Sequence, residues 1–187
     1  MKKIPIFIVI ILVFSACKNE NKNVVKNDNY GIEEGVNEKN ANNSNLLVLG
    51  ETIHDFTAID KNGKNIQLSK LYKKNKLVLL NFWSSRCIPC RKENPNLVNL
   101  YQQYHSKGFE IVSVSVDEDK KNWMNAIEQD KLSWIQICDF NSWSGVIPKQ
   151  FNITETPTMF LINQEGSIVD INLKGEALQA KLKTTFN

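Results

Sequence analysis

Residues 77–90 have the sequence LVLLNFWSSRCIPC, in which an almost unbroken apolar run leads into two cysteines separated by two residues. An apolar run of this length is typical of a β-strand that is buried on both faces of a sheet. Apolar residues then recur at helical spacing, which predicts a helix from about Cys87 to Gly108 with one buried face. We therefore expect a buried strand that delivers Cys87 and Cys90 to the beginning of a helix.

This position suits thiol–disulfide chemistry. A helix N-terminus presents unpaired N–H groups and a positive dipole potential, and both stabilise a thiolate. Cys87 is therefore the expected nucleophile, and Cys90, one turn later on the same face, is the thiol that attacks the mixed disulfide. Pro89 is tolerated because the first N–H groups of a helix have no helical acceptor. The pair itself would be the redox group, with no cofactor and no metal.

Other uses of a Cys-x-x-Cys pair fit less well. A structural zinc site needs further ligands, and only Cys138, His54 and His105 remain in the domain, without a second pair. A c-type haem requires histidine after the second cysteine, where Arg91 stands. A copper-delivery protein would need a ligand downstream, and no histidine follows His105. A structural disulfide is the remaining alternative, although closing so short a loop gains little entropy.

The first sixteen residues have the pattern of an export signal. Met1–Lys3 is positive, and Ile4–Phe14 is apolar but shorter than the roughly 20 residues that span a bilayer. The following Ser-Ala-Cys is similar to a bacterial lipobox, although Phe14 stands where leucine is usual. We expect cleavage before Cys17 and lipid on its sulfur, which would tether the protein to a membrane of the bacterial envelope on the periplasmic side. A plain cleavable signal is the alternative.

Residues 17–45 are expected to form a disordered, lipid-anchored linker, and residues 46–187 a single domain. The linker is rich in Asn, Lys and Glu and has too few large apolar residues to offset its ordering entropy. The net charge of +3 includes Lys2 and Lys3, so the exported chain would be nearly neutral. Such a charge gives no reason to expect a nucleic-acid partner.

The remaining pattern predicts a mixed sheet with helices on both faces. The strand–helix–strand pattern around the cysteines predicts a parallel pair, and the turn residues 60–63 predict a hairpin. Pro95 should kink the long helix, and Ser69 should cap a short one. The expected strands are 56–59, 65–68, 77–83, 110–116, 134–138, 158–162 and 167–171, and the other expected helices are 69–72, 123–129, 145–151 and 176–186.

With these features the sequence resembles the TlpA/ResA-like thiol–disulfide oxidoreductases of the thioredoxin-like superfamily. The resemblance covers residues 50–186, and its most specific segments are 80–83, 87–95, 114–117 and 156–162. It implies a thioredoxin-like α/β fold with an N-terminal β-hairpin and an insertion before the central helix. It also implies reduction or isomerisation of protein disulfides in the envelope, often of apocytochrome c during cytochrome c maturation. Because the chain has no second redox pair, a membrane dithiol donor of the DsbD/CcdA type is expected.

The resemblance also implies roles for single residues. Pro157 matches a cis-proline that faces the dithiol, which would leave the backbone of Thr156 free to pair with a substrate strand. Glu93 matches a glutamate that tunes the cysteines, and it lies one turn beyond Cys90. Classical thioredoxins have a buried aspartate where Asn81 stands, which makes Glu93 the better candidate for a proton acceptor.

One position departs from the family pattern. Many members have tryptophan before the first cysteine, where this chain has Arg86. A guanidinium there should favour the Cys87 thiolate and offer a bidentate donor to acidic groups of a partner. We expect Ile88, Pro89 and Trp83 to complete an apolar rim for substrate docking, although Trp83 fits the core equally well.

Two other classes of function remain open on the sequence alone. A peroxiredoxin-like thiol peroxidase usually has Pro-x-x-x-Thr-x-x-Cys, whereas Leu80 and Ser84 stand at those places here. A non-catalytic binding module would keep the fold without turnover. Cys138 fits a buried free cysteine.

Overall fold

The three-dimensional structure is a computed structural model that describes residues 47–187. The predicted signal peptide, the predicted lipidation site Cys17 and the predicted linker of residues 17–45 lie outside the described residues. Within residues 47–187, no helix combines the length and the apolarity that a membrane crossing requires.

The centre of the fold is a five-stranded mixed sheet with the order β5-β4-β3-β6-β7. The central strand β3 (Leu77–Trp83) pairs in parallel with β4 (Phe109–Ser115), as the strand–helix–strand pattern predicts. Strand β5 (Ile135–Ile137) extends the parallel part of the sheet. Strands β6 (Thr158–Asn163) and β7 (Ile168–Ile171) add an antiparallel hairpin on the other side of β3.

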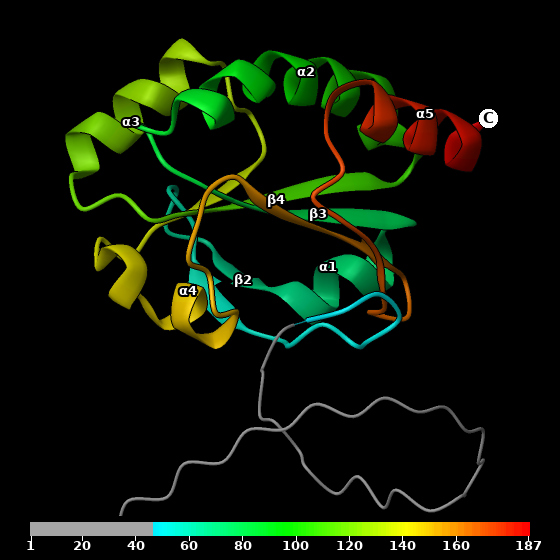
Figure 1. Cartoon of the computed structure of the whole chain (residues 1–187), viewed down its shortest axis with the longest axis horizontal. Helices are drawn as coiled ribbons and strands as arrows, with labels where there is room; N and C mark the ends of the chain where they lie inside the picture. The colour runs from blue at the N-terminus through cyan, green and yellow to red at the C-terminus, as the bar shows by residue number, and fades with distance from the viewer. Residues whose placement is uncertain (1–46) are drawn as a thin grey trace, which may run out of the picture. The chain divides into compact units, whose positions relative to one another are not determined.

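Helices cover both faces of this sheet, as predicted. Figure 1 shows α2 (Ile88–Tyr104), α3 (Lys120–Gln129) and α5 (Gly175–Phe186) on one face. The other face is covered by α1 (Leu68–Lys74) and α4 (Val146–Gln150). Each face therefore has its own hydrophobic core. The dithiol at the beginning of α2 belongs to the core between the sheet and helices α2, α3 and α5.

Alternation along β3 supplies both cores, because successive side chains of a strand point to opposite faces. Val78 and Phe82 pack in the core under α1 and α4, and Leu79 packs in the core under α2. Helix α2 contributes Leu97 and Leu100 to its core, and both are 1% exposed or less. The burial of β3 on both faces agrees with the apolar run that predicted it.

A smaller sheet precedes the central one. Strands β1 (Thr57–Ile59) and β2 (Asn65–Gln67) form the predicted antiparallel hairpin. Asp60 closes its turn, because the Asp60 Oδ1 accepts hydrogen bonds from two backbone N–H groups of the turn. An isolated bridge between Asp60 and Ile137 joins this hairpin to the edge strand β5.

The short helix α1 differs from the prediction. Its N-cap residue is Gln67, so Ser69 lies inside the helix and does not cap it. The Ser69 N–H and Oγ instead donate to the two carboxylate oxygens of Asp55 at 2.8 and 2.7 Å. Two short 3₁₀ helices, η1 (His105–Lys107) and η2 (Ser142–Ser144), complete the elements.

Candidate active site

The position of Cys87 follows directly from β3. The strand ends at Trp83, and residues 84–86 carry the chain to Cys87, which is the N-cap residue of α2. The Cys87 sulfur accepts a hydrogen bond from the backbone N–H of Cys90 at 3.1 Å, as a capping side chain does. The helix N-terminus thus donates to the sulfur, which stabilises a thiolate when the pair is reduced.

The two cysteines form a disulfide in the structure and differ in exposure. Their sulfur atoms are 2.02 Å apart. Cys87 is half-buried, whereas Cys90 is 2% exposed. A sulfur atom of another molecule can therefore approach Cys87 but not Cys90, which is consistent with Cys87 as nucleophile and Cys90 as resolving thiol.

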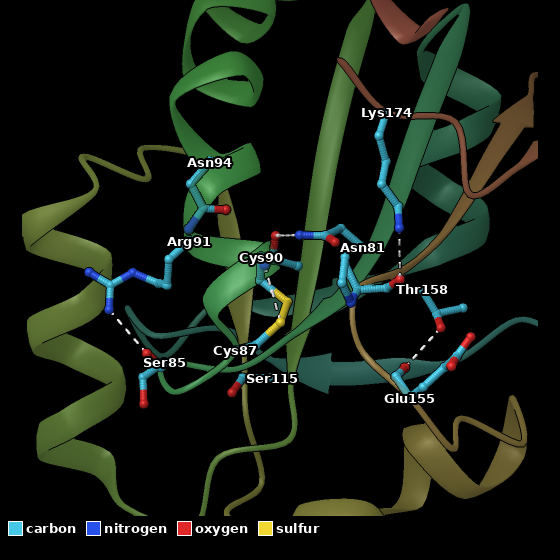
Figure 2. The surroundings of a disulfide bond; sticks show 12 residues. Asn81, Ser85, Cys87, Cys90, Arg91, Asn94, Ser115, Glu155, Thr158 and Lys174 are labelled. Carbon is cyan, nitrogen blue, oxygen red and sulfur yellow. Dashed lines mark hydrogen bonds between the residues drawn. A yellow bond between two sulfur atoms is a disulfide. The ribbon is translucent and has the colours of Figure 1, made fainter.

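The sheet beside the disulfide presents a polar group (Figure 2). Asn81 on β3 is 2% exposed, and its Nδ2 donates to the Ser113 Oγ at 3.2 Å. The Trp134 Nε1 donates to the same oxygen at 2.8 Å. The Asn81 Oδ1 has no hydrogen-bond partner among the described residues. Because a carboxamide does not accept a proton at neutral pH, Asn81 does not serve as the base of this site.

Glu93 is half-buried on α2 and is held by α5. Its Oε1 accepts hydrogen bonds from the Gly175 N–H at 2.9 Å and from the Asn96 Nδ2 at 2.7 Å. Glu93 therefore caps α5, since the N-cap residue Lys174 makes no side-chain cap. These contacts direct the Oε1 atom to α5, and the part of Glu93 in tuning Cys90 remains a prediction.

The Thr156–Pro157 peptide bond is cis, as predicted. Strand β6 runs antiparallel to β3 with Thr158 opposite Phe82, so the Thr156–Pro157 loop lies beside the end of β3 that leads to the dithiol. The Pro157 carbonyl accepts a hydrogen bond from the Lys174 Nζ at 3.4 Å. Within residues 47–187 the backbone of Thr156 makes no hydrogen bond, so it is available to an incoming extended peptide.

Three of the predicted contact residues, Arg86, Ile88 and Pro89, are exposed next to Cys87. The Ile88 side chain is 69% exposed. Arg86 lines a groove of about 220 Å³ together with Trp143 of η2, whose side chain is 43% exposed. An exposed cation and an exposed aromatic ring therefore lie on one side of the dithiol.

Trp83 and Cys138 do not belong to the exposed surface next to Cys87. Trp83 is fully buried in the core under α2, so its predicted place on the rim is corrected to the core. Cys138 is a free cysteine, half-buried, on a cleft of about 440 Å³ between the hairpin, β5 and α4. Burial raises the pKa of its thiol.

Two charged residues, for which the sequence predicted no role, fix the loop before Cys87. Asp117 follows β4 and is 6% exposed, and it accepts hydrogen bonds from Ser85. Arg91 on α2 donates to the Ser85 carbonyl and to Asp130. Both residues lie in segments that carried the family resemblance, which was the signal available in the sequence.

Fold and site together define a thioredoxin-like thiol–disulfide oxidoreductase, in which a buried strand places a dithiol at a helix N-terminus beside a cis-proline loop. The Redoxin family model matches residues 49–184, and the chain belongs to this family.

Curated relatives and solved structures agree with this class. The thiol-disulfide oxidoreductase ResA of Bacillus thuringiensis is 34% identical over 137 residues, covering 73% of this chain and 76% of the relative. ResA of Bacillus subtilis is 37% identical over 122 residues, 65% of each chain. The C-terminal domain of a putative thiol-disulfide oxidoreductase from Bacteroides thetaiotaomicron superposes with a TM-score of 0.68 at 32% identity, covering 74% of this chain and 96% of that one. The predicted thioredoxin-like fold is confirmed.

Proposed function

We propose that this protein is a lipid-anchored reductase or isomerase of protein disulfides in the bacterial envelope. The observation that carries the proposal is the unequal exposure of the pair, with Cys87 accessible at the helix N-terminus and Cys90 buried behind it. The export pattern of residues 1–16 and the lipobox-like Cys17 support the envelope location. The resemblance to ResA-like proteins supports apocytochrome c as one substrate.

The reaction begins when the Cys87 thiolate attacks one sulfur of a substrate disulfide. A bond forms between Cys87 and that sulfur, and the other substrate sulfur leaves as a thiolate that takes up a proton. Cys90 then loses its proton and attacks the Cys87 sulfur, which releases the first substrate sulfur as the second thiol. The substrate gains two electrons and two protons, and the enzyme is left with the Cys87–Cys90 disulfide. A membrane dithiol donor of the DsbD/CcdA type would reduce that disulfide again.

Substrate binding is assigned to the surfaces on both sides of Cys87. The unpaired backbone of Thr156 would pair with the substrate chain next to its cysteine, beside the cis peptide of Pro157. Ile88 and Pro89 would provide apolar contact, and the exposed Arg86 would bind acidic groups of the substrate. Glu93, near Cys90 in the sequence of α2, would accept the proton of the resolving thiol.

The test is a Cys90→Ser variant of the full-length chain expressed in the bacterial envelope. Without the resolving thiol, Cys87 should remain attached to its substrates as a mixed disulfide, which mass spectrometry of the purified adducts would identify. A Cys87→Ser/Cys90→Ser variant is the matched control and should capture none. Adducts with envelope proteins are the expected result, and an adduct-free Cys90→Ser variant would contradict the proposal.

Membrane attachment is tested separately with Cys17→Ser. The wild-type protein should sediment with membranes, and the variant should appear in the soluble envelope fraction. Equal sedimentation of both proteins would overturn the lipid anchor but leave the thiol chemistry standing.

A further inference from the structure

Ser85, two residues before Cys87, uses all of its polar groups in the folded protein. Its N–H donates to one carboxylate oxygen of Asp117 at 2.9 Å, and its Oγ donates to the other at 2.6 Å. The Ser85 carbonyl accepts a hydrogen bond from the Arg91 Nη1 at 3.0 Å. The loop before the nucleophile is therefore held from two sides by oppositely charged residues.

Asp117 and Arg91 are themselves held in place by hydrogen bonds to neighbouring residues. Asp117 also accepts a hydrogen bond from the Ser115 Oγ at 2.6 Å. The Arg91 guanidinium forms a bidentate pair with Asp130, the C-cap residue of α3, through its Nε and Nη2. The buried Asn94 donates to the same carboxylate at 2.6 Å. Bidentate pairing fixes the orientation of a guanidinium as well as its position.

The hydrogen bond between the Arg91 side chain and the Ser85 carbonyl closes a ring that is formed by the chain from residue 85 to residue 91. The backbone N–H of Arg91 donates to the Cys87 carbonyl in the first turn of α2, while its side chain returns to the carbonyl of Ser85. Both cysteines belong to the chain that forms this ring, and Figure 2 shows the contact between Ser85 and Arg91 beside the disulfide. Motion of the loop away from the helix would break the contact between Ser85 and Arg91.

We propose that Arg91 is a positioning residue, which acts with Asp117 through Ser85 to keep the Cys87 sulfur at the N-terminus of α2 in the reduced enzyme. In the disulfide state the Cys87–Cys90 bond holds the Cys87 sulfur against the first turn of α2. Reduction removes this bond, and the ring through Arg91 remains to hold the sulfur over the Cys90 N–H. The proposal rests on the thiol–disulfide chemistry of the site and does not depend on which substrate is reduced.

An effect of the Arg91 charge alone on the Cys87 thiolate can be distinguished from a positioning role, because the two predict different results for two variants. If Arg91 stabilised the Cys87 thiolate only by its charge, Arg91→Lys would preserve the effect. Asp130→Asn removes a negative charge, which by electrostatics alone would lower the pKa of Cys87. If Arg91 acts by position, both substitutions loosen the loop and raise that pKa. The two explanations therefore predict opposite signs for Asp130→Asn.

The experiment measures the rate of Cys87 alkylation in the reduced full-length protein as a function of pH, by mass spectrometry of the Cys87 peptide. For Arg91→Lys and Asp130→Asn we expect the midpoint of the profile to rise by about half a pH unit or more, the scale of one weakened hydrogen bond to a thiolate. Lys92→Gln is the matched control, since Lys92 is an exposed cation on the adjacent position of α2, and its midpoint should not move.

An unchanged midpoint in Arg91→Lys, or a lowered midpoint in Asp130→Asn, would overturn the proposal. Thermal unfolding of each variant shows that alkylation is measured on folded protein, and if Arg91→Lys does not fold, Asp130→Asn decides alone. Alkylation requires no physiological substrate. A failed substrate trap with Cys90→Ser would therefore contradict the proposed function without affecting this result.

Discussion

At the scale of single residues, the three cysteines of the described domain show how location determines the reactivity of one functional group. The Cys87 sulfur accepts a hydrogen bond from a backbone N–H at the N-terminus of α2, and Cys90 is buried behind it. Cys138 lines a cleft on another part of the surface. The Cys138 thiol donates to the Asp117 carbonyl at 3.4 Å, and burial raises its pKa. The thiolate is the nucleophilic form, so Cys138 should react slowly at neutral pH.

We predict that iodoacetamide labels Cys87 faster than Cys138 in the reduced protein at pH 7.5, by about tenfold or more, because the helix end favours the Cys87 thiolate and burial disfavours that of Cys138. Peptide mass spectrometry after timed labelling measures both rates in one sample. Disulfide reduction by Cys138→Ala should match that of the wild type. Equal labelling rates would contradict the difference in environment.

At the scale of elements, the turn between β6 and β7 depends on close approach to α1. Gly166 has φ +85°, and a Cβ at this position would lie 2.9 Å from the Tyr72 ring. The Gly166 carbonyl accepts a hydrogen bond from the Ile53 N–H at 2.8 Å, so the turn also holds the chain that precedes β1. One residue thus joins three parts of the fold.

Gly166→Ala should lower the free energy of unfolding by about 1–3 kcal/mol, because it combines an unfavourable backbone conformation with a steric clash against Tyr72. Urea denaturation measures the change. Gly63→Ala is the matched control, since Gly63 has φ +80° with no atom within 4 Å of the added Cβ. The loss should be larger at Gly166, and equal losses would show that Tyr72 moves aside freely.

At the scale of the whole molecule, stability depends on pH through a buried acid far from the dithiol in the sequence. Glu110 on β4 is 8% exposed, and burial raises the pKa of its carboxyl above the ordinary 4.5. The backbone N–H of Ile111 and the nearby His105 act in the opposite direction and only partly offset burial. The folded state therefore binds the Glu110 proton more tightly than the unfolded state does.

The sign of the effect follows from linkage. The folded state holds the extra proton between the unfolded and the folded pKa, so the contribution of Glu110 is fully present below the ordinary 4.5 and is lost as pH rises through the raised value. Glu110→Gln should therefore be more stable than wild type at pH 7.5, and the difference should shrink towards pH 4. Urea denaturation at both pH values measures this, and a gain that is the same at both would contradict it.

The sequence by itself determined the elements that depend on local pattern. The apolar run predicted β3 with the bounds that the structure shows, because burial on both faces favours apolar residues at almost every position. The two-residue spacing of the cysteines after that strand predicted the dithiol at a helix end, and the match to the family pattern predicted the cis bond at Pro157.

The tertiary structure alone decided which polar groups meet. Asp117 and Ser85 are 32 positions apart, and Arg91 and Asp130 are 39 apart, so neither contact has a local signature. The same holds for Glu93, whose carboxylate accepts a hydrogen bond at the N-terminus of α5. The burial of Trp83 in the core was likewise decided by packing. A short pattern fixes how the backbone runs, but hydrogen bonds between distant segments exist only after the sheet and helices have packed.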